Sequence, residues 1–179
     1  MRIIGGEWSS RRINAPAEGL RPTADRVREA VFNILVHEVD IETCTVLDLF
    51  AGSGAMGIEA LSRGAQSAVF VEHNATTASI VEENLREFNA EARGTVVRSD
   101  ALKYVCKNCE PADIIFADPP YAYTGIDELV ACLMERSLFR RILVIEHDAT
   151  LVIETYGHTP WKQRTFGATG ITMFLRGDQ

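Results

Sequence analysis

The chain alternates between short segments that are continuously apolar and longer segments whose apolar residues recur every three or four positions. The apolar segments predict strands at residues 45–50, 68–72, 95–99, 113–118 and 142–146. The segments between them predict helices at 55–63, 74–88 and 125–137, with a shorter one ending near Lys107. Continuously apolar strands are typical of a parallel sheet that is covered on both faces. We therefore predict an α/β fold with a doubly wound, mostly parallel sheet.

The two ends of the chain depart from this alternation. Residues 161–166 and 171–176 read as an antiparallel hairpin at the edge of the sheet, which brings the strands to seven. At the other end, residues 2–4 and 12–14 predict a small hairpin, and a helix is expected from a cap at Thr23 to about Glu38. We expect residues 1–40 to form an arm and helix packed on a main domain of residues 41–179.

Acidic residues mark the ends of the first four predicted strands. Asp48 lies near the end of the first strand and Glu72 ends the second. Asp100 follows the third strand and Asp118 ends the fourth. A single acid at a strand end is most often a turn or helix cap. Because ligands of open α/β sheets bind outside the carboxyl ends of the strands, four such acids together predict one acidic binding crevice.

A glycine-rich loop follows the first strand. Gly52, Gly54 and Gly57 match the pattern G-x-G-x-x-G, and Glu72 follows Gly52 by twenty residues, which also fits a dinucleotide-binding fingerprint. A dinucleotide would bring its pyrophosphate close to the negative charge of Asp48. S-adenosylmethionine carries an ammonium and a sulfonium but no phosphate, so acidic surroundings favour it over NAD. The glycines allow the backbone to approach such a ligand closely.

The fourth strand runs into Asp118-Pro119-Pro120-Tyr121. Two prolines restrict φ and remove two N–H donors, so this segment predicts a rigid corner that holds a carboxylate, a backbone carbonyl and an aromatic ring together. An exocyclic base amine is a poor nucleophile because its lone pair is delocalised into the ring. Two acceptors that grip the amine protons favour a pyramidal nitrogen and stabilise the charge that develops during attack. The corner therefore indicates amino-methyl transfer, with Tyr121 stacking on the base.

The chain resembles the bacterial 16S ribosomal RNA guanine-N2 methyltransferase family from end to end. The motifs that carry the resemblance are R-I-I-G-G at 2–6, R-P-T-A-D-R-V-R-E-A at 21–30, D-L-F-A-G-S-G at 48–54, E-A-L-S-R-G-A at 59–65 and D-P-P-Y at 118–121. The resemblance implies a Rossmann-like fold of the class I methyltransferase type. It also implies methyl transfer from S-adenosylmethionine, leaving S-adenosylhomocysteine, to a guanine N2 of 16S ribosomal RNA within a small-subunit particle.

Individual roles follow from these motifs. The residues expected at the chemical step are Asp118, Pro119 and Tyr121. Those expected to bind the cofactor are Asp48, Phe50, Gly52, Gly54, Glu72, Asp100 and Ala101. Glu72 is expected to accept hydrogen bonds from the ribose hydroxyls and Asp100 from the adenine amino group. No metal is expected to take part.

Charge is distributed unevenly along the chain. The net charge is −7, yet residues 1–28 carry a local balance of +3 and the remaining residues one of −10. A basic arm on an acidic body suggests an anionic partner. The arginines expected to contact RNA phosphates are Arg2, Arg11, Arg12, Arg21 and Arg26. Arg28 is expected instead to form an ion pair with an acidic residue of the main domain.

The remaining composition limits the classes of protein that need to be considered. No apolar run is long enough to span a bilayer, and residues 1–12 do not resemble a signal peptide, so a cytoplasmic protein is expected. A monomer is also expected. Cys106 and Cys109 form a lone C-x-x-C without a second ligand pair, and are expected to be two thiols on a helix or its exit rather than a zinc or redox site.

Three alternative functions remain open at this stage. The first is methylation of a different amine, adenine N6 in DNA or in another RNA. The second is an NAD(P)-dependent oxidoreductase, because the glycine loop also fits a dinucleotide. The third is an RNA-binding assembly factor without activity, which the intact D-P-P-Y argues against.

Overall fold

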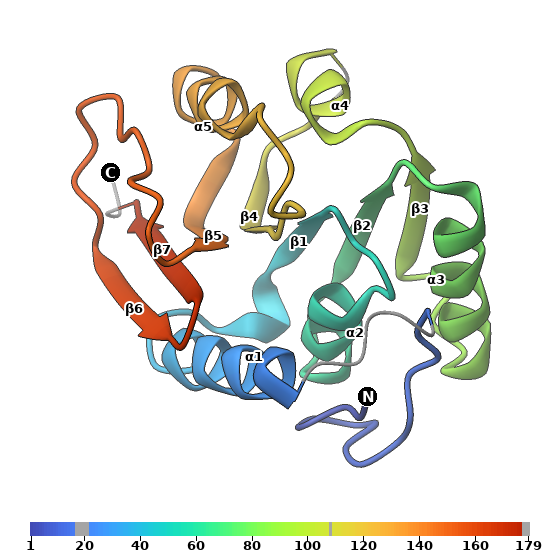
Figure 1. Ribbon diagram of the computed structural model, residues 1–179. Coiled ribbons are helices and arrows are strands. Elements are labelled where there is room, and N and C mark those ends of the chain that lie inside the picture. The colour runs from blue at the N-terminus through green and yellow to red at the C-terminus, as the bar shows by residue number, and fades with distance from the viewer. Residues whose placement is uncertain (17–21, 108, 177–179) are drawn as a thin grey trace.

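Seven strands form one sheet in the order β3-β2-β1-β4-β5-β7-β6 (Figure 1). The structure is a computed structural model that describes residues 1–16, 22–107 and 109–176. The strands are β1 (Thr45–Leu49), β2 (Ser67–Glu72), β3 (Gly94–Arg98), β4 (Ala112–Ala117), β5 (Phe139–Asp148), β6 (Lys162–Phe166) and β7 (Thr169–Leu175). β1 to β5 pair in parallel, and β7 pairs antiparallel with both β5 and β6. The predicted doubly wound sheet with a C-terminal hairpin is confirmed.

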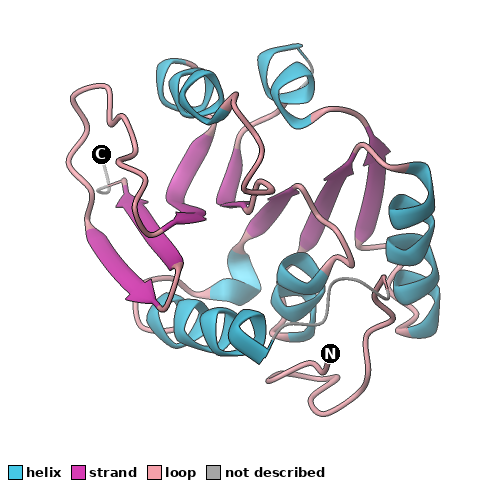
Figure 2. Ribbon diagram, in the orientation of Figure 1, coloured by secondary structure: helices cyan, strands magenta, loops and turns pink. Residues whose placement is uncertain are grey.

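Helices cover both faces of the sheet (Figures 1 and 2). They are α1 (Pro22–Leu35), α2 (Ala55–Ser62), α3 (Ala75–Glu87), α4 (Ala101–Lys107) and α5 (Ile126–Glu135). One apolar core lies between the sheet and α1, α2 and α3, and includes Phe32, Phe70 and Phe116. A second core lies between the opposite face and α4 and α5, and includes Leu49, Ile115 and Leu133. Alternate residues of β1 and β4 enter different cores, which explains why these strands are apolar throughout.

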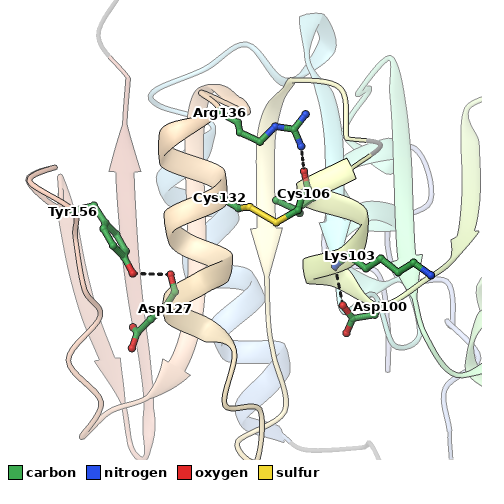
Figure 3. The surroundings of a disulfide bond; sticks show 8 residues. Asp100, Lys103, Cys106, Asp127, Cys132, Arg136 and Tyr156 are labelled. Atoms are coloured by element: carbon green, nitrogen blue, oxygen red, sulfur yellow. Dashed lines mark hydrogen bonds between the residues drawn. A yellow bond between two sulfur atoms is a disulfide. The ribbon is translucent and has the colours of Figure 1, made fainter.

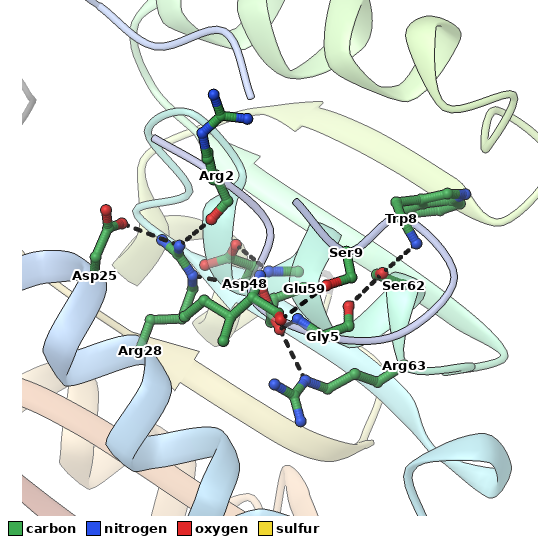
Figure 4. A network of polar contacts seen from close by, with 12 residues as sticks. Arg2, Gly5, Trp8, Ser9, Asp25, Arg28, Asp48, Glu59, Ser62 and Arg63 are labelled. Carbon is green, nitrogen blue, oxygen red and sulfur yellow. Dashed lines mark hydrogen bonds and ion pairs between the residues drawn. The ribbon is translucent and has the colours of Figure 1, made fainter. Parts of the chain in front are cut away.

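The N-terminal arm is part of the first core. Arg2 and Arg12 form an antiparallel bridge, so the predicted small hairpin is confirmed. Ile3, Trp8 and Ile13 are buried in the same core as α1. The buried carboxylate of Glu59 on α2 accepts hydrogen bonds of 2.8 Å from the backbone N–H groups of both Ile4 and Gly5 (Figure 4). The arm is therefore held by main-chain contacts to α2 as well as by apolar packing.

Several details differ from the expectations, and α1 ends at Leu35 rather than near Glu38. α1 begins at Pro22 and not after Thr23; proline is favoured in the first turn, where its missing N–H has no helical partner in any case. The cysteine prediction is wrong for Cys106, which forms a disulfide with Cys132 and so links α4 to α5 (Figure 3). Cys109 is a free, buried thiol, and burial raises the pKa of this group to about 11. The pairing depends on two helices packing side by side, which spacing along the chain does not reveal.

The order in which successive strands are added to the sheet reverses after β3, so that β1 and β4 lie side by side. β2 and β3 extend the sheet to one side of β1, whereas β4 and β5 extend it to the other. Chain connections leave β1 and β4 toward opposite faces at this point, and such a switch point opens a crevice at the carboxyl ends of the strands. Among the described residues, no helix is long and apolar enough to cross a bilayer.

Candidate active site

A cavity of about 690 Å³ lies at the carboxyl ends of β1, β2, β4 and β5. One part of its wall comes from the β1 and β2 ends and the start of α4, with Phe50, Glu72 and Asp100. The other part comes from the segment after β4, residues 118–123, together with Glu146 of β5. The fold therefore brings Phe50, at the start of the glycine loop, and the D-P-P-Y corner to a single cavity, although they lie far apart in the sequence.

The glycine loop turns sharply as it leaves β1. Phe50, Gly52 and Gly54 all have positive φ, of 61°, 55° and 79°. A side chain on Gly54 would be strained by this backbone and would meet three apolar side chains at 3.1–3.3 Å. A Cβ on Gly57 would lie 2.3 Å from the Phe70 ring, so this glycine allows α2 to pack directly on β2. The loop thus needs its glycines for backbone shape and for packing.

Asp48 lies beneath this loop. Its Oδ2 accepts a 2.9 Å hydrogen bond from the N–H of Gly57, in the first turns of α2. Burial raises the pKa of Asp48 to about 8; the Gly57 hydrogen bond opposes the shift, and the charges of Asp118 and Glu72 add to it. Asp48, Gly52 and Gly54 are not among the described residues that line the cavity. Asp48 therefore supports the loop from below.

Glu72 connects the loop to the second strand. Its buried carboxylate accepts hydrogen bonds from the N–H of Gly52 at 3.0 Å and from the N–H of Asn74 at 2.8 Å. The Nδ1 atom of His73 lies 3.3 Å from Oε1. A carboxylate has about four acceptor positions, so Glu72 can hold the loop and still accept hydrogen bonds from a ligand in the cavity that it lines.

Asp100 also has two roles, one in capping a helix and one in lining the cavity. Its Oδ1 accepts a 2.8 Å hydrogen bond from the N–H of Lys103 and so caps α4 (Figure 3). Asp100 and Ala101, the first residue of α4, both line the cavity. The acids at the ends of the first three strands therefore each accept from a backbone N–H, and two of the three also face the cavity.

The D-P-P-Y corner forms a tight turn after β4. The N–H of Tyr123 donates to the carbonyl of Pro120 at 2.7 Å, and the Tyr123 ring contacts Phe50 edge-on with centroids 4.9 Å apart. Pro119 is buried, whereas Asp118 and Tyr121 are exposed and line the cavity. Tyr121 is 53% exposed, and its hydroxyl shares a 3.3 Å hydrogen bond with the hydroxyl of Thr169 on β7.

Sequence reasoning missed two contributors to this site. Glu146 lines the cavity from β5, whereas the expected acids were those at the ends of the first four strands. The same rule, applied to the predicted strand 142–146, would have found it. Thr169 supports Tyr121 from the C-terminal hairpin, and no signal in the sequence links these residues because the contact depends on β7 pairing with β5.

The N-terminal arginines have different surroundings. Arg28 is buried, donates to Asp25 at 3.0 Å, and lies 3.6 Å from Glu59, so the expected pairing with acids is confirmed (Figure 4). Arg2 donates to the carbonyl of Ser10. Arg11 donates to the carbonyl of Glu87 at 2.8 Å, and its guanidinium lies 4.4 Å from the centre of the Phe88 ring.

The other three arginines that are expected to contact RNA are Arg12, Arg26 and Arg21. Arg12 and Arg26 are both exposed, on the arm hairpin and on α1 respectively. Arg21 lies outside the described residues. Arg11 of the arm contacts the last residue of α3, the helix that leads from the carboxyl end of β2 to the start of β3. Arg11 therefore lies near the amino ends of these strands, on the side of the sheet opposite the cavity.

The fold and the cavity define a class I methyltransferase. One crevice is lined by Phe50 at the start of the glycine loop, by an acid at the end of the second strand, and by an aspartate, two prolines and a tyrosine after the fourth. A structural neighbour described as "Putative methyltransferase yhhF from Escherichia coli" superposes with a TM-score of 0.86 at 32% identity, covering 100% of this chain and 99% of that one.

The model of a family described as Conserved hypothetical protein 95 matches residues 1–175, and the chain belongs to this family. Among its relatives, ribosomal RNA small subunit methyltransferase D of Escherichia coli (strain K12) is 40% identical over 134 residues, which are 74% of this chain and 66% of that protein. The protein of the same name from Haemophilus influenzae is 32% identical over 182 residues, 97% of this chain and 93% of its own length. These matches confirm the resemblance to the bacterial 16S ribosomal RNA methyltransferase family.

Proposed function

We propose that this protein transfers the methyl group of S-adenosylmethionine to the exocyclic N2 amine of a guanine in 16S ribosomal RNA. The observation that carries the proposal is the single cavity lined by Glu72 and Asp100 on one side and by Asp118 and Tyr121 on the other. This arrangement offers acceptors for a cofactor and acceptors for an amine within the same cavity.

The charge of the cavity fits the cofactor. Among the described lining residues there are four acids, Glu72, Asp100, Asp118 and Glu146, and neither lysine nor arginine. Such a wall attracts an ammonium and a sulfonium but repels the pyrophosphate of a dinucleotide, which makes NAD(P) the poorer fit. S-adenosylmethionine, when bound, supplies an electrophilic methyl group.

The walls suggest how the cofactor is held. Glu72 is proposed to accept hydrogen bonds from the ribose hydroxyls and Asp100 from the adenine amino group. Phe50 and Ala101 supply apolar wall, while the backbone at Gly52 and Gly54 lets the loop come close to the ligand. Asp48 is proposed to act indirectly, by holding α2 and the loop in place through Gly57.

At the other end of the cavity the corner is proposed to act on the target base. The Asp118 carboxylate and the backbone carbonyl of Pro119 accept hydrogen bonds from the two amine protons. This grip directs the nitrogen lone pair out of the ring plane and stabilises positive charge as it forms on the nitrogen. The exposed ring of Tyr121 provides a surface on which a base turned out of its RNA helix can stack.

Recognition of RNA outside the cavity is assigned to the N-terminal part. We propose that residues 1–40 act as a docking extension of the methyltransferase domain, residues 41–179. Arg12 and Arg26 are both exposed and are the first candidates for phosphate contacts, because the guanidinium groups of Arg2 and Arg11, although exposed, already donate to backbone carbonyls. Arg2, Arg11 and Arg21 are further candidates. The names of the relatives support a small-subunit RNA substrate, and we propose a monomer that acts in the cytoplasm on a ribosomal particle.

The alternative within the same chemistry is an adenine N6 acceptor in DNA or another RNA. One experiment separates the two: mass spectrometry of nucleosides from the 16S ribosomal RNA of cells that lack the gene, compared with cells carrying the wild type or Asp118→Ala. The proposal requires N2-methylguanosine to fall by one residue per RNA in the deletion and to return only with the wild type. An unchanged nucleoside profile would contradict it.

A further inference from the structure

Glu146 is the one acid of the cavity that the proposed mechanism leaves without a role. It lies near the end of β5, which neighbours β4 in the sheet. Ala117 of β4 and Ile145 of β5 are register partners in a parallel pair. The next residues along the two strands are Asp118 and Glu146, so the two carboxylates leave the sheet side by side and line the same cavity.

The backbone at Glu146 is held firmly. Glu146 still pairs with Ile171 in the antiparallel ladder between β5 and β7. The following residue, His147, is buried, and its Nε2 lies 2.9 Å from the hydroxyl of Thr172 on β7. Glu146 itself is half-buried. The backbone therefore fixes the position of the Glu146 carboxylate next to the more exposed Asp118. A fixed position suits a group that recognises a bound nucleobase by hydrogen bonding.

Guanine and adenine differ on the edge that this pair of acids would meet. In guanine the N2 amine adjoins N1–H, so the edge presents neighbouring donors. Adenine carries an unprotonated N1 beside its N6 amine, and 2-aminopurine carries an unprotonated N1 beside its N2 amine. An ionised carboxylate only accepts hydrogen bonds. A carboxylate beside the amine site therefore attracts guanine and repels either of the other bases.

We propose that Glu146 accepts a hydrogen bond from N1–H of the target guanine and so selects guanine over bases with an unprotonated N1. This inference rests on the proposed function, because it assumes that Asp118 and Pro119 engage the N2 amine. Enzymes turn a bound base out of its helix and identify it through hydrogen bonds to its Watson–Crick edge. Glu146 supplies such a contact from a strand, where its position is set by the sheet.

The test uses 16S ribosomal RNA in which the target guanosine, located by nucleoside mapping, is either kept or replaced with 2-aminopurine by ligation of a synthetic oligonucleotide. Both RNAs, free and reconstituted into small-subunit particles, are methylated by the wild type, by Glu146→Gln and by Glu135→Gln. Glu135 is exposed on α5 and outside the cavity lining, so its variant controls for the loss of a charge. kcat/KM is measured for each pair, and S-adenosylhomocysteine affinity is measured by calorimetry.

The wild type and Glu135→Gln should prefer guanine to 2-aminopurine by at least about a hundredfold, because a site built for a donor rejects the analogue that lacks it. The amide of Glu146→Gln can donate to the unprotonated N1, so the preference should fall at least about tenfold. Its affinity for S-adenosylhomocysteine should stay within about twofold of the wild type.

Other outcomes overturn the inference in distinguishable ways. A wild type that methylates both RNAs equally, or an unchanged preference in a folded Glu146→Gln, leaves the proposed function intact but removes the role of Glu146. An unchanged preference with weakened S-adenosylhomocysteine binding assigns Glu146 to the cofactor instead. If the wild type forms N6-methyladenosine and no N2-methylguanosine, the proposed function and this inference fail together. The comparison of the two RNAs by the wild type needs no variant, so equal methylation of both RNAs overturns the inference even if Glu146→Gln misfolds.

Discussion

At the scale of single residues, the acids at the strand ends combine structural and chemical tasks. Glu72 holds Gly52 and Asn74 through their N–H groups while it lines the cavity. Asp100 caps α4 and lines the cavity as well. The expectation that an acid is either a cap or a ligand-binding group is therefore too simple here, because one carboxylate has enough acceptor positions for both.

Glu72→Ala should weaken S-adenosylmethionine binding by roughly 1–3 kcal/mol, the scale of a charge-assisted hydrogen bond. Calorimetric titration with S-adenosylhomocysteine measures the change, and circular dichroism confirms that the variant folds. Glu82→Ala, an exposed acid on α3, is the matched control. Unchanged affinity in a folded Glu72→Ala would refute the assignment of Glu72 to the ribose.

Asp118→Ala should leave cofactor affinity nearly unchanged and lower turnover on the order of a hundredfold or more, because it removes one preorganised acceptor from the site of developing charge. Asp118 is exposed at the end of β4, so the substitution leaves the core intact. Single-turnover methylation of the RNA or particle separates this effect from product release. Near-normal turnover would exclude the proposed role of the corner.

Asp48 gives the folded state a specific dependence on pH. Burial raises its pKa from the ordinary value of 3.8 to about 8, so between these values the folded state holds a proton that the unfolded state has released. The free energy of unfolding contributed by this group therefore falls as pH rises from about 4 to about 8, by at most about 1.4 kcal/mol per pH unit, and is constant above the folded pKa.

Asp48→Asn can still accept from the N–H of Gly57 but cannot titrate, so this contribution should disappear. Urea denaturation between pH 4.5 and 9 gives the difference in free energy of unfolding between the two proteins. That difference should favour Asp48→Asn increasingly toward high pH and then level off. Asp127→Asn, an exposed residue on α5, controls for the loss of a carboxyl. A difference that is flat over this range would contradict the raised pKa.

At the scale of elements, the C-terminal hairpin has a part in the site. β7 lies between β5 and β6, and Thr169 at its start is buried and bonded to the hydroxyl of Tyr121. The hairpin was predicted correctly as an edge structure of the sheet. Its contact with the D-P-P-Y corner was not, because that contact joins two segments that are separated by 48 residues.

Thr169→Val and Tyr121→Phe should each raise KM for the RNA about two- to tenfold, the range of one neutral hydrogen bond, with kcat little changed. The double variant should be no worse than either single one, because both remove the same bond. Tyr121→Ala should cost more, roughly 1–3 kcal/mol, since it also removes the stacking ring. Additive effects in the double variant would show that the two hydroxyls act separately.

Element boundaries followed the sequence closely where the apolar pattern was strong. β1, predicted at 45–50, spans Thr45–Leu49, and α3 starts after Asn74, whose side chain accepts from Thr76 and Thr77. β5 was predicted at 142–146 but spans Phe139–Asp148. Its first residues include two arginines, which interrupt the apolar run, and Phe139 at this end pairs with Ala112 of β4. At the other end, His147 and Asp148 pair with β7. The ends of β5 are therefore set by pairing with neighbouring strands and not by the local apolar pattern.

At the scale of the whole molecule, the basic arm proves to be partly structural. Glu59 and Ser62 of α2 bind the main chain of the arm, and the buried Arg28 contacts the carbonyl of Arg2. Arg11 packs on Phe88 at the edge of the sheet away from the cavity. Part of the positive charge near the N-terminus is thus used in holding the arm, and the exposed remainder is proposed to meet RNA.

Replacing both Arg12 and Arg26 with alanine should weaken binding to the RNA or particle and lower the slope of log K against log salt by about one for each lost phosphate contact. Arg140→Ala, an exposed arginine at the start of β5 and outside the N-terminal part, should leave the slope unchanged. Filter binding at several salt concentrations measures both. Equal slopes for the double variant and the wild type would show that these two arginines do not contact phosphates.

The sequence by itself determined the layered α/β fold, because the strands are apolar throughout and the helices between them carry the 3.6-residue period. It also located the glycine loop, the corner at Asp118 and three further strand-end acids, since all lie beside predicted strands. Tertiary structure alone decided which groups meet: Glu146 beside Asp118, Thr169 on Tyr121, Cys106 with Cys132, and Asp48 buried under α2. Register between neighbouring strands and the packing of helices side by side set these contacts, and neither is encoded in spacing along the chain.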